Sequence, residues 1–133
     1  MMSATPSRLP PVTPNAVEGL YATGYWLFTQ QRVTHALSVF RAMIHLASFD
    51  ERGWLALGAC YEMQDEPDVA LEVYVAGIRL IRSAPRCEVA RARILRARGR
   101  TREARGALAE AARTARNSQD EELSAIVAAE WLG

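Results

Sequence analysis

The sequence predicts an all-α fold of three stacked helical hairpins followed by one covering helix. Apolar residues recur every three or four positions through residues 51–82, which is the spacing of amphipathic helices. Large side chains alternate there with small ones, as at Trp54 and Gly58, and small residues let two helices approach closely. A single hairpin of this length leaves apolar surface exposed, so neighbouring hairpins are expected.

A shift of 34 residues aligns the sequence with itself through three copies. The aligned columns are Gly24, Gly58 and Ala92; Leu27, Tyr61 and Leu95; Ala36, Ala70 and Ala104; and Phe40, Tyr74 and Leu108. This period, with the order W-x-x-L-G-x-x-Y and then A-x-x-x-Y in the middle copy, resembles the tetratricopeptide repeat. The resemblance implies hairpins that stack as a right-handed superhelix.

Composition divides the chain into a short leader and one repeat domain. Residues 1–14 carry four prolines and little periodic apolar content, which predicts a flexible proline-rich leader. Residues 15–133 are the predicted tetratricopeptide-repeat domain, with repeats at about 17–50, 51–84 and 85–116. A capping helix is expected at about 118–132, with one apolar face formed by Leu123, Ile126, Val127 and Trp131.

Polar residues and prolines mark the expected helix ends. The expected N-caps are Asn15, Asp50, Ser83 and Thr101, and Ser118 with Glu121 has the spacing of a capping box. Pro67 and Pro85 suit the first turn of a helix, where no amide hydrogen is lost.

Charge and hydropathy exclude several classes of protein. The net charge is +1, and no apolar run is long enough to span a membrane or to form the centre of a signal peptide. We therefore expect a cytoplasmic protein without stable membrane insertion. Seven arginines lie between positions 91 and 105, but no aromatic residues interleave them, so a solvated helix face is favoured over a nucleic-acid site.

Nothing in the sequence indicates catalysis. His35 and His45 are isolated, and neither a glycine-rich phosphate loop nor a nucleophile motif is present. Cys60 and Cys87 lie far apart within predicted helices, which indicates buried reduced thiols rather than a metal or redox pair. We expect no enzyme activity, no metal and no cofactor.

The first helix of each hairpin is expected to line the inner curve of the stack. The inner positions are Glu18, Tyr21, Tyr25 and Phe28, then Arg52, Leu55, Ala59 and Met63, then Arg86, Val89, Arg93 and Arg96. They predict an aromatic and aliphatic groove that runs into a basic end and suits an extended peptide. The candidate peptide-binding residues are Tyr21, Tyr25, Phe28, Leu55, Ala59, Met63, Val89 and Arg93. The alternative is that the three aromatic residues pack in the core or under the leader.

A more specific resemblance covers roughly residues 17–112. The segments Tyr21-x-x-Gly-Tyr25-x-x-Phe28 and Asp50-x-x-x-Trp54-Leu-x-Leu-Gly-Ala-Cys60 resemble the tetratricopeptide chaperones of bacterial type III secretion systems, particularly those that hold the hydrophobic translocators. The resemblance implies a non-enzymatic cytoplasmic chaperone that binds a translocator segment in its groove and keeps it soluble until export. It assigns the groove to Tyr21, Tyr25, Phe28, Leu55, Ala59 and Met63.

The chain also departs from that family. Glu88, Arg91 and Arg93 stand where a more apolar stretch is expected, and only the leader precedes Asn15, where the family tends to carry a helical region used in dimerisation. The sequence therefore leaves open whether the chain forms a homodimer. A needle-subunit chaperone of the same secretion system and a general peptide-binding adaptor are the alternatives.

Overall fold

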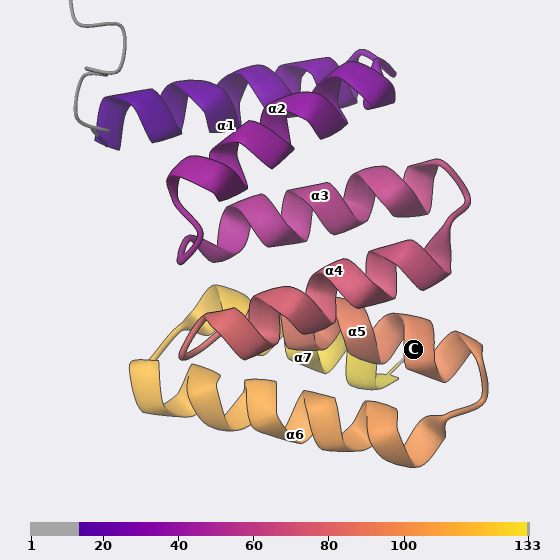
Figure 1. Cartoon of the computed structure of the whole chain (residues 1–133). Helices are drawn as coiled ribbons and strands as arrows, with labels where there is room; N and C mark the ends of the chain where they lie inside the picture. The colour runs from indigo at the N-terminus through magenta and orange to yellow at the C-terminus, as the bar shows by residue number, and fades with distance from the viewer. Residues whose placement is uncertain (1–13, 133) are drawn as a thin grey trace, which may run out of the picture.

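The computed structural model describes residues 14–132, which form seven α-helices and no strand (Figure 1). The helices are α1 (Pro14–Thr29), α2 (Val33–Leu46), α3 (Glu51–Met63), α4 (Pro67–Leu80), α5 (Pro85–Ala97), α6 (Thr101–Ser118) and α7 (Glu121–Leu132). The predicted all-α class is confirmed. Positions 1–13 of the expected leader lie outside the described residues, and Pro14 is the first residue of α1.

The helices pair as hairpins that stack in chain order. α1 packs against α2, α3 against α4 and α5 against α6, and Figure 1 shows these hairpins following one another with α7 against the last of them. The first helices of successive hairpins also touch, because α1 contacts α3, α3 contacts α5 and α5 contacts α7. These four helices therefore form one continuous inner layer.

A glycine facing an aromatic ring sets the spacing within the first two hairpins. A Cβ atom at Gly24 would lie 2.5 Å from the Phe40 ring, and one at Gly58 would lie 2.1 Å from the Tyr74 ring. Both rings are almost completely buried, so neither has space to move aside. The expected use of small residues where two helices approach closely is confirmed at Gly24 and Gly58.

The hydrophobic core runs across the boundaries between repeats. One buried cluster joins α1, α2 and the start of the second hairpin through residues such as Phe40, Met43 and Leu57. Another joins α5, α6 and α7, where Leu95 and Leu108 pack with Leu123. Because these clusters take side chains from more than one hairpin, each hairpin depends on its neighbour for burial.

The helix ends agree only partly with expectation. Asp50 caps α3, since its carboxylate accepts a hydrogen bond from the Arg52 backbone N–H at 3.1 Å, and Pro67 and Pro85 begin α4 and α5 as predicted. The expected caps at Asn15 and Thr101 are wrong, because these residues lie inside the helices that begin at Pro14 and Thr101.

The cap of α5 comes from the preceding repeat. Ser83 was the expected cap, but Ala84 occupies the N-cap position and makes no side-chain hydrogen bond. The Glu51 carboxylate on α3 instead accepts a hydrogen bond from the Cys87 backbone N–H at 2.9 Å. The contact is partly buried between α3 and α5, and this burial raises the pKa of the Glu51 carboxyl.

The covering helix begins later than the capping-box pattern predicts. α6 continues through Ser118, whose hydroxyl donates to the Thr114 carbonyl at 2.7 Å, so this serine is not the cap. Asp120 caps α7 by accepting from the Leu123 backbone N–H at 2.9 Å. Of the expected apolar face, Leu123 and Val127 are buried whereas Ile126 and Trp131 are exposed.

We expect Gly58→Ala to lower the free energy of unfolding by about 2 kcal/mol, because the new methyl group would overlap the buried Tyr74 ring. Gly106→Ala is the matched control, since a Cβ atom there has nothing within 4 Å. This control should gain up to about 1 kcal/mol from helix propensity. Chemical denaturation of both variants measures the difference, and equal shifts would contradict the close helix approach.

Cys60 and Cys87 are buried and free, as predicted. Burial raises the pKa of the Cys60 thiol to about 11 and raises that of Cys87 as well. Neither thiol should react with a disulfide reagent at neutral pH in the native protein, and both should react in denaturing guanidinium. Rapid labelling of either cysteine under native conditions would show that the inter-repeat core opens.

Candidate functional site

The inner layer of helices carries one continuous groove. A hollow of about 170 Å³ lies between α1 and α3, and a second hollow of about 510 Å³ extends from α1 and α3 to α5 and α7. Both are lined by Tyr21, Arg52, Leu55 and Ala59, so they are two parts of the same groove. We call it the inner groove.

The wall of the inner groove formed by α1 is aromatic. The ring centroids of Tyr21 and Tyr25 lie 6.2 Å apart, and those of Tyr21 and Phe40 lie 6.4 Å apart. Tyr21 and Phe28 are half-buried and pack against the first core cluster, whereas Tyr25 is 58% exposed. Tyr21 and Phe28 therefore both pack in the core and line the groove, whereas Tyr25 is not a core residue.

Arg52 organises the floor between α1 and α3. Its guanidinium carbon lies 4.7 Å from the Tyr21 ring centroid, and its nitrogens bond to the Glu18 carboxylate at 2.6 Å and the Asp50 carboxylate at 2.8 Å. These hydrogen bonds lower the pKa of both carboxyls and raise that of Arg52. The cation is therefore fixed between two carboxylates and an aromatic face.

The expected basic end of the groove is not free, because carboxylates pair with its arginines. Arg86 pairs with Asp120 at 3.2 Å, Arg93 pairs with Glu62 at 2.7 Å, and Arg96 pairs with Glu130. Of the three partner carboxylates, Asp120 is the N-cap of α7 and Glu130 lies on α7, so acidic side chains cover the predicted basic end. Charge at this end is largely compensated.

The Arg93 ion pair reaches into the core. The Tyr74 hydroxyl donates to the same Glu62 oxygen that pairs with Arg93, and the Tyr74 ring fills the space beside Gly58. Burial, followed by this hydrogen bond to a carboxylate, raises the pKa of Tyr74. A surface arginine of the groove is thus connected to the packing of the second hairpin.

Three of the ion pairs follow the repeat length. Glu18 with Arg52, Arg86 with Asp120 and Arg96 with Glu130 are each separated by 34 residues in sequence. Equivalent positions on successive first helices therefore face one another. Consequently, α7 occupies the place of the first helix of a further repeat.

α7 contributes groove residues that the sequence analysis did not assign. Glu122 and Ile126 line the larger hollow together with Val89 of α5. The signal was present in the sequence, because the 34-residue register that defined the repeats continues from Glu88 to Glu122. Because α7 was expected only to cover the last repeat, its residues were not assigned to the groove.

The predicted peptide-binding residues gather unevenly. Those that line the smaller hollow are Tyr21, Tyr25, Phe28, Leu55 and Ala59. Val89 and Arg93 line the larger hollow, although Val89 is only 4% exposed and offers little surface. Met63 is exposed at the end of α3 and lines neither hollow.

The described part of the chain shows neither a metal cluster nor a membrane span. Within residues 14–132, no group of His, Cys, Asp and Glu side chains is placed to hold a metal ion. Over the same residues, no helix has both the length and the apolar character needed to cross a bilayer.

Comparison with known proteins gives matches among solved structures. No family model and no curated protein sequence matches the chain. The translocator chaperone SycD of Yersinia enterocolitica is 28% identical, with a TM-score of 0.77 and 88% of each chain covered. PcrH from Pseudomonas aeruginosa is 26% identical, with a TM-score of 0.76, over 93% of this chain and 95% of PcrH.

A further structure holds PcrH in complex with the chaperone binding region of PopB. The matched chain of that structure is 26% identical to this chain, with a TM-score of 0.75, and the match covers 92% of this chain and 99% of the other.

Three stacked hairpins around an inner groove define the class, which is a helical-repeat protein of the tetratricopeptide type. Within this class, the chain is similar to the type III secretion translocator chaperones SycD and PcrH along about 90% of its length. The resemblance expected from the sequence is confirmed.

The Arg52 cluster predicts a pH-dependent contribution to stability. The lowered pKa of Asp50 stabilises the fold above its ordinary value of 3.8, and this stabilisation is lost as pH falls through the folded-state pKa. Asp50→Asn keeps a capping side chain but removes the charge. We expect it to lose about 1 kcal/mol near neutral pH and almost nothing in strong acid.

Asp68→Asn is the control for this measurement, because Asp68 pairs with Arg98 but its side chain is 82% exposed. Its effect on unfolding should stay within about 0.5 kcal/mol at every pH. Urea denaturation across the acid range compares the two variants. A loss for Asp50→Asn that is the same at all pH values would contradict a role for the carboxylate charge.

Proposed function

We propose that this chain is a non-catalytic chaperone of the bacterial cytoplasm. It binds an extended segment of a type III secretion translocator in the inner groove and keeps that translocator soluble and competent for export. The observation that carries the proposal is a continuous groove with an aromatic wall, in a chain that is similar along most of its length to translocator chaperones. PcrH, one of these similar proteins, is known in complex with the chaperone binding region of PopB.

The chemistry of the groove favours apolar anchors on the bound segment. Tyr25 is exposed at its mouth, and Leu55 and Ala59 form an aliphatic floor beside it. The arginines farther along are paired with carboxylates, so they offer little net charge to a ligand. Binding energy therefore comes mainly from side chains that enter the aromatic half, as is usual for a few buried anchors in a peptide interface.

The proposed contact residues are the eight predicted from the sequence, and they differ in how much of the groove each one lines. Tyr21, Tyr25, Phe28, Leu55 and Ala59 surround the smaller hollow and form the principal site. Val89 and Arg93 border the larger hollow, where the chain of the client continues toward α7. Met63 has an exposed side chain and provides a peripheral contact.

Tyr25→Ala should weaken client binding by about 30-fold, which corresponds to the loss of one anchor of about 2 kcal/mol. Trp26→Ala is a matched control on the same helix, because Trp26 is 56% exposed and lines neither hollow of the groove. The chaperone binding region of a translocator, such as that of PopB, would be co-expressed with each variant, and the soluble complex measured after affinity purification. Circular dichroism and thermal melting should be unchanged in both variants.

Leu55→Arg provides a second test, since it places a charge in the floor of the smaller hollow. The client should become insoluble when co-expressed with this variant. Equal recovery of the translocator with Tyr25→Ala and Trp26→Ala would contradict the assigned groove. Recovery of unrelated soluble proteins in place of a translocator would instead indicate a general peptide-binding adaptor.

A further inference from the structure

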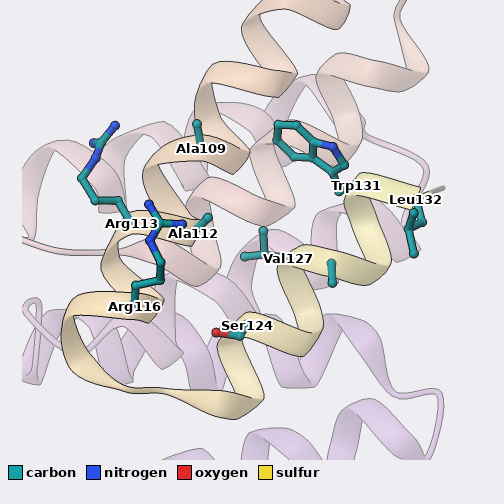
Figure 2. A pocket seen from close by; sticks show the side chains of 9 residues that line it. Ala109, Ala112, Arg113, Arg116, Ser124, Val127, Trp131 and Leu132 are labelled. Atoms are coloured by element: carbon teal, nitrogen blue, oxygen red, sulfur yellow. The ribbon is translucent and has the colours of Figure 1, made fainter.

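A second groove lies between α6 and α7, away from the inner groove. Its hollow measures about 630 Å³ and is lined by Ala109, Ala112, Arg113, Arg116, Ser124, Val127, Ala128, Trp131 and Leu132. Figure 2 shows the arginines on the α6 side and Trp131 with Leu132 on the α7 side. None of these residues lines the inner groove. We call it the C-terminal groove.

The floor and one wall of the C-terminal groove are apolar and accessible. Trp131 is 51% exposed and Leu132 is 86% exposed, although both are large apolar side chains. Ala109 and Ala112 lie opposite on α6, and their small side chains leave the hollow open. An exposed tryptophan beside a row of alanines is the kind of surface that a partner's apolar side chains cover.

The shape of the C-terminal groove fits a helix. The groove runs between α6 and α7, which pack against each other. The side chains of a third helix can enter a groove between two packed helices. An amphipathic helix is thus the shape that this surface accepts.

The charge beside the groove specifies the partner further. Arg102 and Arg105 lie on the same stripe of α6 as Ala109, Ala112 and Arg116, because three- and four-residue steps share one helix face. Arg113 pairs with Glu110, but Arg102, Arg105 and Arg116 make no ion pair with any described residue. This uncompensated charge contrasts with the paired arginines of the inner groove.

A second copy of the chain does not satisfy this charge. A two-fold symmetric dimer through this groove would bring the arginine stripes of both copies into one interface. Like charges at such an interface oppose association. The occupant that compensates the stripe is a helix that carries carboxylates.

We propose that the C-terminal groove docks an amphipathic helix of a partner protein, with its apolar stripe against Trp131 and the α6 alanines and its carboxylates beside Arg102, Arg105 and Arg116. This site is separate from the client groove. The chain can therefore hold a client and a second protein at the same time.

The test uses two synthetic helical peptides with the same leucine stripe, flanked by glutamates in one and by lysines in the other. Fluorescence anisotropy of the labelled peptides measures binding to the full chain. The glutamate peptide should bind at least about tenfold more tightly than the lysine peptide, and the difference should shrink as salt is added. Equal affinities for the two peptides would overturn the proposal.

Variants locate the binding. Arg116→Glu and Trp131→Ala should each weaken the glutamate peptide by about tenfold. Arg82→Glu has the same charge change at an exposed arginine outside both grooves and should have no effect. Tyr25→Ala should also leave this binding intact, which separates the result from the client site. Loss of binding in Tyr25→Ala, or a dimer of the free chain that Trp131→Ala dissociates, would overturn the proposal.

Discussion

The close approach of a glycine to an aromatic ring within each of the first two hairpins is the contact on which the rest of the structure depends. Gly58 admits the Tyr74 ring, and Gly24 admits the Phe40 ring. This contact fixes the distance between the two helices of a hairpin and therefore the direction in which the next hairpin stacks. Through its hydroxyl, Tyr74 also holds Glu62, which holds Arg93 at the groove. Internal packing thus determines where the surface side chains stand.

The sequence predicted the features that depend on repeated local patterns. The 34-residue repeat and helical periodicity predicted the three hairpins, the seven helices and the placement of Tyr21 and Tyr25 on one face of the first helix. Pro67 and Pro85 also predicted the starts of α4 and α5, since a proline constrains the backbone within a single helical turn. Local chemistry repeated in register is strong information about a helical stack.

Features that depend on contacts between distant residues were missed. Glu51 serves as a cap for α5 in place of Ser83, and only the packed structure brings these two helices together. The sequence predicted a basic end at the arginines of the third repeat, because their carboxylate partners are distant in sequence: Asp120 is the N-cap of α7, and Glu130 lies near the end of α7. The C-terminal groove was also unpredicted, since it requires the orientation of α7.

The spacing of the inter-repeat ion pairs bears on how such a chain tolerates changes in its number of repeats. Glu18, Arg52, Arg86 and Asp120 follow one another at intervals of 34 residues, at or near the start of the four inner helices. Deletion of the second repeat would place Glu18 beside Arg86, and deletion of the third would place Arg52 beside Asp120. Each new junction still joins an acid to a base. The order acid, base, base, acid thus lets a shortened gene encode a stack whose remaining modules stay electrostatically matched.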